Sequence, residues 1–316
     1  IRPSIPQGER LPNGFIQDLI EHALKQIERR SMMNAEYVTP KDLGEVFKAL
    51  EGKKGRIKFI AGGTNVMPNI RSKAISPEVI IDLTGLKDLA HVREEAGMVS
   101  IGALTTIAAV ASSGLIRKLS PILASAAASL GNPLTRNRAT LGGNLADASP
   151  AADTAPPLLA LEATVHSARP GGRGREIPLD QFFLGPRRTV LEEDEIMTRI
   201  TFPKPKDPSA GSHIKFGLRN AMAISVASIA VMLEREGKRC RKARVALGAV
   251  APKPIRACLV EKRLEGKELD REVIEASAAA IQEEISPISD IRASAQYRRL
   301  VTSVLLKRSI EEALKG

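Results

Sequence analysis

Residues 136–153 read RNRATLGGNLADASPAAD, and this stretch decides the fold. Within it, Thr140-Leu141-Gly142-Gly143-Asn144 places two adjacent glycines between an apolar residue and a hydrogen-bonding side chain. A second glycine pair stands upstream, in Ile60-Ala61-Gly62-Gly63-Thr64-Asn65-Val66. Glycine permits positive φ and close approach of a ligand, so successive backbone N–H groups can converge on an anion. Two such loops in one chain suit a ligand that carries two phosphates.

Neither loop matches the commoner nucleotide-binding motifs. The chain contains no Gly-x-x-x-x-Gly-Lys-Ser/Thr and no Gly-x-Gly-x-x-Gly. The first is the phosphate loop of many nucleotide hydrolases, and the second is the dinucleotide fingerprint of the Rossmann fold. Neither class of protein is therefore supported.

Composition describes a globular protein that is poor in soft metal ligands. Hydrophobic residues make up 43% of the chain and charged residues 26%, as in ordinary soluble domains. Cys240 and Cys258 are the two cysteines, and they follow no Cys-x-x-Cys spacing. A four-thiolate iron–sulfur cluster cannot be built from them, and we expect no metal site in this chain.

The same features indicate a cytoplasmic protein. Two cysteines without a regular framework favour a reducing compartment. Residues 1–33 lack the apolar stretch of a signal peptide. The longest uncharged apolar run, Ala221 to Leu233, has 13 residues, against roughly 20 for a membrane-spanning helix. We expect no membrane insertion.

The net charge of +11 raises nucleic acid as a partner. One dense basic cluster lies between two apolar runs, Ile224 to Leu233 and Val245 to Val250, which predict strands joined around Glu236-Gly237-Lys238. A solvated hairpin tip and a docking patch for a protein both fit this cluster. No aromatic residues interleave it, as a surface for single-stranded nucleic acid would require, so we expect no nucleic acid partner. The cluster consists of Arg235, Lys238, Arg239, Arg241, Lys242 and Arg244.

Strand and helix patterns alternate from residue 35 onward. Thr39 reads as an N-cap and Pro40 as the first residue of a helix that continues to Ala49. Helical spacing also occurs in the otherwise loose N-terminal segment, at Phe15 to Arg30. Lys204 to Ser212 is the best linker candidate. The other predicted elements are strands at 58–60, 79–83 and 98–101, helices within 105–130, and a C-terminal helix with one apolar face from Tyr297 to Ile310.

Ala61-Gly62-Gly63-Thr64 and the stretch 136–153 resemble the two flavin motifs of the FAD-binding (medium) subunit of molybdenum hydroxylases. This family includes xanthine dehydrogenase, molybdenum-type carbon monoxide dehydrogenase and 4-hydroxybenzoyl-CoA reductase. The resemblance implies an α+β fold: a two-part FAD-binding domain of the vanillyl-alcohol-oxidase (PCMH) type, then a smaller α+β domain. The expected division is an N-terminal extension at 1–33, an FAD-binding domain at 34–205 with parts 34–104 and 105–205, and a C-terminal domain at 211–316.

The resemblance also implies which residues hold the cofactor, FAD. The first loop would wrap the pyrophosphate with backbone amides, and the second would hold it from the other side. Asp153 matches an acidic position that contacts the cofactor, and Lys215 matches a lysine near the flavin. The predicted cofactor-binding set is Ile60, Ala61, Gly62, Gly63, Thr64, Asn65, Val66, Leu130, Thr140, Leu141, Gly142, Gly143, Asn144, Asp153, Ile196, Met197 and Lys215.

Simpler roles compete with several of these assignments. Asp153 could cap a helix at 154–161, Lys215 could be an exposed strand lysine, and Met197 could be an ordinary core residue. Arg136 and Asn137 could brace the second loop rather than contact a ligand.

Two positions depart from the family pattern. Asn65 stands where relatives often have Asp, and Leu130 stands where some have an aromatic residue. The first change removes a charge but keeps the turn-forming capacity, so we expect pyrophosphate binding to survive.

The implied function is electron transfer by a flavoprotein subunit, an oxidoreductase with no catalytic residue of its own. A large molybdopterin-containing subunit and a small [2Fe-2S] subunit would be its partners, and NAD or another acceptor would take the electrons. The cofactor carries such chemistry while the protein positions it. A stand-alone flavin-dependent reductase and a non-catalytic scaffold subunit remain as alternatives.

Overall fold

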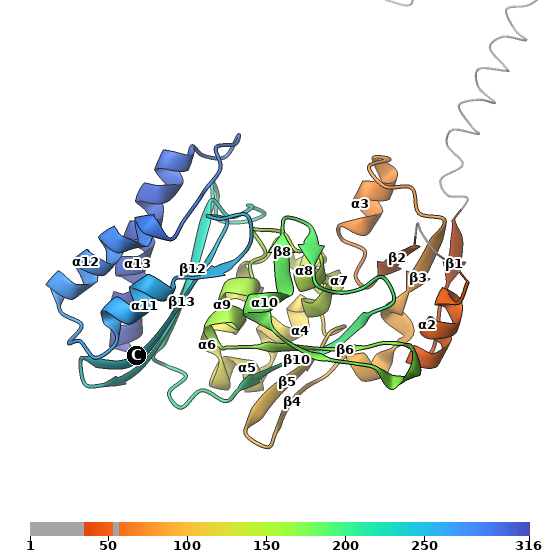
Figure 1. Ribbon diagram of the computed structural model, residues 1–316, viewed down its shortest axis with the longest axis horizontal. Coiled ribbons are helices and arrows are strands. Elements are labelled where there is room, and N and C mark those ends of the chain that lie inside the picture. Colours follow the sequence, from red (N-terminus) through yellow and green to blue (C-terminus); the bar gives the residue numbers. More distant parts are fainter. Residues whose placement is uncertain (1–34, 53–56) are drawn as a thin grey trace, which may run out of the picture.

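The computed structural model describes residues 35–52 and 57–316. The predicted N-terminal extension, with its helical spacing at 15–30, lies outside these residues. In the described part, three larger sheets follow one another along the long axis of the molecule (Figure 1). No helix of this part is long and apolar enough to cross a membrane.

The first sheet is parallel and small. Its strands β1 (Glu36–Val38), β3 (Val79–Asp82) and β2 (Ile57–Ile60) stand in the order β1-β3-β2. The central strand β3 is buried at its first three residues, because helix α2 (Leu43–Leu50) and the loops after β3 cover the sheet. Helix α3 (Val66–Arg71) follows β2 directly after the first glycine loop. The predicted strands at 58–60 and 79–83 are confirmed within one residue.

The predicted start of the first helix is wrong. Helix α2 begins at Leu43, and its N-cap is Asp42, whose Oδ1 accepts the N–H of Glu45 at 2.8 Å. The Glu45 carboxylate in turn accepts the N–H of Lys41 at 2.8 Å. Such reciprocal bonds satisfy N–H groups that a helix leaves without partners in its first turn. They outweigh the preference of Pro40 for the first helical position.

The second sheet is antiparallel and supplies the middle of the molecule. Its order is β4-β5-β10-β6-β7, and a two-stranded ribbon, β8–β9, lies beside it. The strands are β4 (Val92–Glu95), β5 (Met98–Gly102), β6 (Thr164–Ala168), β7 (Glu176–Pro178), β8 (Phe183–Gly185), β9 (Arg188–Thr189) and β10 (Ile196–Pro203).

Within the described residues 57–316, seven short helices accompany this sheet. The helical stretch predicted within 105–130 is confirmed as three of them, separated where Ser113 and Ser120 act as N-caps. The helices are α4 (Ile107–Ser112), α5 (Gly114–Leu119), α6 (Pro121–Ser129), α7 (Pro133–Arg138), α8 (Leu141–Ala146), α9 (Ala155–Ala160) and α10 (Leu179–Phe182).

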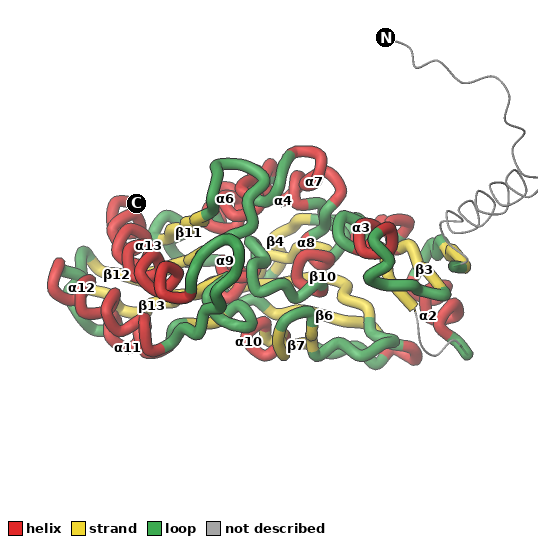
Figure 2. The backbone as a smooth tube through the Cα atoms, turned by 90° about the horizontal axis from the view of Figure 1, so that it is seen from above, coloured by secondary structure: helices red, strands yellow, loops and turns green. Residues whose placement is uncertain are grey.

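The third sheet is antiparallel, with β11 (Gly211–Phe216), β12 (Ala227–Glu236), β13 (Arg239–Gly248) and β14 (Ile255–Arg256) in sequence order. Helices α11 (Cys258–Leu264), α12 (Arg271–Ala280) and α13 (Ala295–Lys315) lie together against it (Figure 2). Both faces of β12 are buried, since Ile229 and Val231 pack toward these helices and Ala230 and Met232 toward the middle of the molecule. Burial on both faces explains its continuous apolar run.

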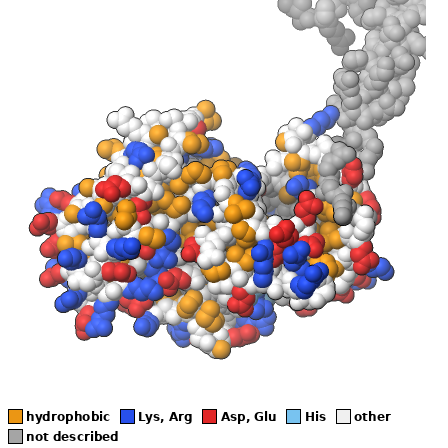
Figure 3. Space-filling view, viewed as in Figure 1, with side chains coloured by type: hydrophobic (Ala, Val, Ile, Leu, Met, Phe, Trp, Pro, Cys, Tyr) orange, Lys and Arg blue, Asp and Glu red, His pale blue; other side chains and the backbone are white. Residues whose placement is uncertain are grey.

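The predicted hairpin is confirmed, with Gly237 at positive φ in its turn. Three of the six residues of its basic cluster pair with carboxylates within the chain. Arg241 pairs with Glu236, Lys242 with Glu162, and Arg244 with both Glu162 and Glu234. Basic and acidic side chains are likewise intermixed over the face shown in Figure 3. The predicted domain boundaries stay a prediction. Of the predicted linker Lys204 to Ser212, residues 204–210 connect β10 to β11, and Gly211 and Ser212 already belong to β11.

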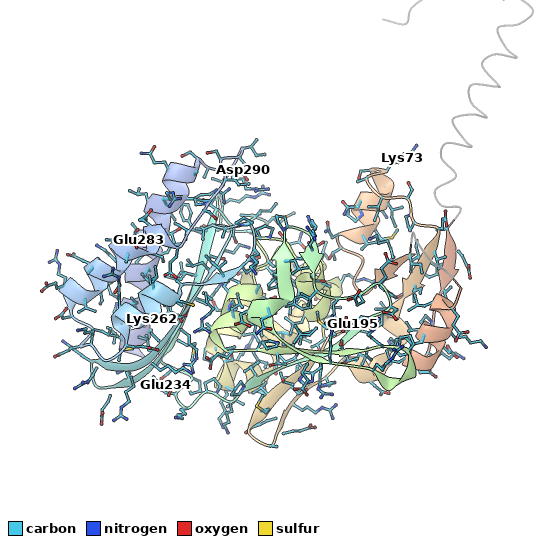
Figure 4. The ribbon with its side chains drawn as sticks, in the orientation of Figure 1. Lys73, Glu195, Glu234, Lys262, Glu283 and Asp290 are labelled. Atoms are coloured by element: carbon cyan, nitrogen blue, oxygen red, sulfur yellow. The ribbon has the colours of Figure 1, made fainter. Side chains whose placement is uncertain are left out.

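A buried arginine ties α13 to the third sheet. Arg298 is 2% exposed, and its Nη1 donates to the carbonyl oxygens of Val226 at 2.5 Å and Ala249 at 3.1 Å. Its Nη2 donates to Asp290 at 2.8 Å, and Asp290 lies at the upper end of the helical layer (Figure 4). The bond to Val226 fixes the point where the loop after β11 enters β12.

We expect Arg298→Met to lower the free energy of unfolding by about 3–5 kcal/mol, because it leaves the buried carbonyl groups of Val226 and Ala249 without their donor and removes one of the two arginines that pair with Asp290. Urea unfolding measures the change. Arg308→Met, on the exposed side of the same helix, is the control and should change stability by less than about 0.5 kcal/mol. Equal losses in both variants would contradict the assigned role.

Candidate functional site

A cleft of about 670 Å³ lies between the first sheet, which is parallel, and the second sheet with its helices. Apolar core residues from around two sheets line it. Leu83 and Ile196 belong to the core around the first sheet, and Leu130 and Met197 belong to the core around the second sheet. Its volume falls within the range of about 300–1,000 Å³ that is usual for cofactor and ligand sites.

Most of the residues predicted from the sequence line this cleft. They are Ala61, Gly62, Gly63, Thr64, Asn65, Val66, Leu130, Thr140, Gly142, Gly143, Asn144, Ile196 and Met197. Ile60 and Leu141 are buried next to the wall, and Asp153 and Lys215 lie in a separate cluster described below. A direct contact with the cofactor stays a prediction for each residue.

The second predicted loop, residues 140–144, is the N-cap and first turn of helix α8 rather than a loop, and we keep the name second loop for it. Both glycine segments make close backbone contacts, through Gly62 and Gly142. A Cβ atom at Gly62 would stand 1.9 Å from the carbonyl oxygen of Arg138, and one at Gly142 would stand 2.7 Å from the Cβ and the carbonyl oxygen of Ala103. No side chain fits at either point. The glycines therefore join β2 to the second loop and the second loop to the end of β5.

The loops differ in what they offer a ligand. Among the described residues, no acceptor is recorded for the backbone N–H groups of residues 62–65. The N–H groups of Leu141, Gly142, Gly143 and Asn144 all bond within the chain, to Thr105, Ala103 and Thr140. Among the described residues, amides are thus left for a ligand in the first loop and not in the second, and their convergence on a ligand stays a prediction.

The second loop presents side-chain donors instead. The Asn144 Oδ1 atom accepts the hydroxyl of Thr154 at 2.6 Å, which leaves the Nδ2 group without an acceptor among the residues described. Thr140 accepts the N–H of Gly143 at 3.1 Å, so its own hydroxyl hydrogen remains to be donated. Each residue can therefore give one neutral hydrogen bond to a phosphate oxygen.

Asn65 has a specific role at the meeting point of the loops. Its amide donates to the Asp147 carboxylate, which also pairs with Arg187. An ionised Asp at position 65 could only accept hydrogen bonds and would repel Asp147, so the departure from the family pattern has a physical reason. Sequence reasoning missed Asp147 and Arg187. Asp147 lies inside the decisive stretch 136–153, but nothing local marks Arg187.

Part of the cleft wall is apolar. Met197 is 7% exposed and both belongs to the middle core and lines the cleft, so its two competing interpretations are compatible. The remaining large apolar residues of this wall are Phe59, Ile75, Leu83, Leu104, Leu130, Leu191 and Ile196.

A buried carboxylate, Glu195, fixes the strand that carries this wall (Figure 4). Arg175 donates to it from Nε and Nη2, both at 2.8 Å, and Ser167 and the N–H of Glu192 add bonds at 2.5 and 3.0 Å. Burial alone would raise the pKa of Glu195, but these donors outweigh it and lower the pKa to about 2.

Asp153 and Lys215 form an ion pair between the second and third parts of the molecule. The Lys215 Nζ donates to Asp153 at 2.7 Å and to the carbonyl oxygen of Ser129 at 3.2 Å, and Ser225 donates to Asp153 at 2.8 Å. Burial raises the pKa of the Asp153 carboxyl, and Lys215 opposes that rise. Ser129 precedes Leu130, which lines the cleft. The cluster therefore fixes the backbone next to this part of the cleft wall.

Two of the simpler roles are therefore wrong. Helix α9 has Thr154 as its N-cap, without a side-chain cap bond, so Asp153 does not cap it. The Lys215 side chain is 10% exposed and is not a surface lysine. Arg136 donates to the carbonyl oxygen of Leu130 at 2.9 Å, which agrees with a bracing role.

One glycine loop whose amides meet no acceptor among the described residues, and a second that offers side-chain donors, lie beside an apolar wall. This arrangement suits a cofactor with phosphate and aromatic parts, and known proteins show which class it is. Residues 31–205 match the family model described as the FAD binding domain in molybdopterin dehydrogenase. Residues 212–313 match the CO dehydrogenase flavoprotein C-terminal domain. The chain is thus an FAD-binding flavoprotein with the predicted α+β fold.

Curated relatives agree along most of the chain. The carbon monoxide dehydrogenase medium chain of Hydrogenophaga pseudoflava is 33% identical, covering 88% of this chain and 96% of the relative. The glyceraldehyde dehydrogenase medium chain of Sulfolobus acidocaldarius is 32% identical, covering 87% and 97%. The putative xanthine dehydrogenase FAD-binding subunit of Escherichia coli K12 is 31% identical, covering 81% and 88%.

Solved structures agree as well. A carbon monoxide dehydrogenase structure from Hydrogenophaga pseudoflava superposes with a TM-score of 0.86 at 32% identity, covering 89% of this chain and 97% of the other. The chain therefore belongs to the FAD-binding subunits of the molybdenum hydroxylase family, and it is the flavoprotein subunit of an oxidoreductase of the carbon monoxide dehydrogenase and xanthine dehydrogenase type.

We expect Gly62→Ala to abolish FAD uptake and to lower the free energy of unfolding by about 1–3 kcal/mol, because the new methyl group forces the two loops apart. Flavin fluorescence and urea unfolding measure the two effects. Gly114→Ala is the matched control, since a Cβ there meets open space at an ordinary φ. Normal FAD affinity in Gly62→Ala would show that the loop contact is not needed.

Glu195→Gln should lose stability in a pH-dependent way. The folded-state pKa of Glu195, about 2, lies below the ordinary value of 4.5. The wild-type carboxylate therefore stabilises the fold above pH 4.5, by about 3 kcal/mol, and this contribution disappears as the pH falls toward 2. Urea unfolding should show a large difference between variant and wild type at pH 7 that narrows between pH 4.5 and 2. A difference that does not depend on pH would contradict the assignment.

Proposed function

We propose that this chain transfers electrons within a three-component molybdenum hydroxylase. A large molybdopterin-containing subunit passes electrons to [2Fe-2S] clusters on a small subunit. This chain receives the electrons from those clusters and delivers them to NAD or another acceptor. The observation that carries the proposal is the cleft whose first glycine loop has four consecutive backbone N–H groups, those of residues 62–65, that meet no acceptor among the described residues and can bind a phosphate-bearing cofactor.

FAD fits the residues that are present. Its pyrophosphate would lie against residues 62–65 and the side chains of Thr140 and Asn144, and its rings would lie along the apolar wall that includes Ile196 and Met197. Bound there, FAD supplies the capacity to accept and release electrons. The chain itself binds and orients the cofactor and excludes water from the apolar part of the cleft.

The acidic groups of the cleft favour electron transfer over acid–base catalysis. Among the described residues that line it, Asp147 pairs with Arg187, and Glu195 is held ionised by Arg175. A stand-alone reductase would need a proton donor near its substrate, with a pKa near the working pH. Glu195 does not meet that need, because its pKa is lowered to about 2. The Asp147 carboxylate is occupied by the Asn65 amide and by Arg187.

The cysteines support the need for a partner with its own redox centres. Cys240 is buried on β13, where burial raises its thiol pKa to about 11, and Cys258 is exposed at the start of α11. A raised pKa keeps the thiol protonated, whereas metal ligation requires the thiolate. No group of three or more metal-ligating side chains occurs within residues 35–52 and 57–316.

The names of the relatives point the same way. The similar chains of carbon monoxide dehydrogenase and glyceraldehyde dehydrogenase are named medium chains, and the similar chain of xanthine dehydrogenase is named an FAD-binding subunit. Such names belong to components of larger enzymes, and we extend that organisation to this chain.

Two experiments test the proposal. The chain expressed alone with FAD should bind the cofactor in equimolar amount, as judged by its visible absorbance. Purified from its native source, the chain should bring with it one subunit that contains iron and sulfide and one that contains molybdenum, and only the assembled complex should reduce an acceptor with substrate. Substrate turnover by the isolated flavoprotein would favour the stand-alone reductase instead.

A further inference from the structure

We propose that Arg187 is a further cofactor-binding residue, whose guanidinium group binds the pyrophosphate of FAD while Asp147 holds it in place. This inference rests on the binding of FAD in the cleft, and it adds a cationic contact to the neutral donors of the glycine loops.

The charges on the cleft wall single out Arg187. The ionisable side chains that line the cleft in the described residues are Lys58, Asp147, Arg187 and Glu195. Arg175 compensates Glu195 through two hydrogen bonds. Lys58 is an exposed residue of β2 for which no hydrogen bond with either loop is seen among the described residues. Asp147 accepts the amide of Asn65 in the first loop, and Arg187 pairs with Asp147. Asp147 and Arg187 are thus the charges joined directly to the first loop.

Without Arg187, this site would bind a pyrophosphate weakly. The free N–H groups of residues 62–65 are neutral donors, and the Asp147 carboxylate beside them repels a phosphate. Like charges in a partly enclosed cleft interact strongly, because water screens them less than it does at an open surface. Arg187 offsets the charge of Asp147 and adds charge-assisted hydrogen bonds, which are stronger than neutral ones.

The backbone holds Arg187 over the cleft. It lies at the tip of the β8–β9 ribbon, in the left-handed region with φ of +61°, and its N–H donates to the carbonyl oxygen of Ala148 at 2.9 Å. A non-glycine residue in this conformation is strained unless its surroundings hold it there. The bond to Ala148 links the tip to the residue that follows Asp147.

The side chain keeps donors free for a ligand. Asp147 takes up Nη1 of Arg187, whereas no partner among the described residues is recorded for its Nε and Nη2 groups. The side chain is 58% exposed, so these donors can be reached from the cleft. A guanidinium group is planar and carries five N–H donors, so it can bond a carboxylate with one part and a phosphate with another.

The test compares Arg187→Gln, Arg187→Lys and Arg188→Gln in the flavin-free chain. Arg188 is the matched control, because it is an exposed arginine on the same ribbon that does not line the cleft. Titration with FAD, followed by flavin fluorescence, should give a dissociation constant at least about tenfold higher for Arg187→Gln, since one charge-assisted bond is lost. Arg187→Lys should lie between it and wild type, and Arg188→Gln should stay within about twofold of wild type.

Competition with fragments of FAD isolates the phosphate contact. In the wild type, ADP should displace FAD at lower concentration than adenosine does, and this advantage should shrink at least severalfold in Arg187→Gln. Added salt should weaken FAD binding less in that variant than in wild type. Both readouts are ratios within one variant, so a general loss of stability does not imitate them.

The outcomes separate this inference from the function on which it rests. If the wild-type chain takes up no FAD, the proposed function and this inference both fail. Two results with an FAD-binding wild type would overturn only the role of Arg187. In the first, Arg187→Gln binds FAD as tightly as the wild type does. In the second, ADP and adenosine lose their ability to displace FAD from Arg187→Gln to the same degree.

Discussion

The backbone contact between the two glycine loops is the constraint on which the cleft depends. Gly62 lies so close to the carbonyl group of Arg138 that any side chain there would overlap it, and Gly142 packs in the same way against Ala103. Together these contacts join the first parallel sheet to the middle of the molecule through the end of β5. Segments about eighty residues apart in the chain thus form one wall, and the apolar residues of both cores meet around the same cavity.

Polar groups around the cleft divide into those that hold the structure and those that are left for a ligand. Glu195 and Asp153 are buried carboxylates, and each is paired: Glu195 with the partly exposed Arg175, and Asp153 with Lys215 and Ser225. Buried ionic groups are tolerated when they are paired and fully hydrogen-bonded. The free amides of residues 62–65 stand out against this background, because the cost of leaving them without a partner is offset only when a cofactor or water binds there.

Sequence patterns predicted the elements whose signals are local. Short apolar runs located the strands at 58–60 and 79–83, and the turn at Gly237 located the hairpin. The helix near residue 40 was placed too early, because the capping interaction of Asp42 with Glu45 is stronger than the signal from Pro40. Arg187 escaped notice because its position depends on a ribbon of two- and three-residue strands that no pattern marks.

By itself, the sequence determined the family, the α+β class, the cofactor and most of the cleft wall, because the glycine motifs are long and each glycine meets a steric requirement that no other residue satisfies. Only the tertiary structure decided which amides are available to a ligand. Those of the first loop meet no acceptor among the described residues, whereas Leu141 and Gly142 of the second loop donate to Thr105 and Ala103, just after β5. The partners of Asn65, Asp153 and Lys215 were also decided there. These are pairings between distant segments, and pairings of that kind depend on how the sheets and loops pack rather than on any local pattern of residues.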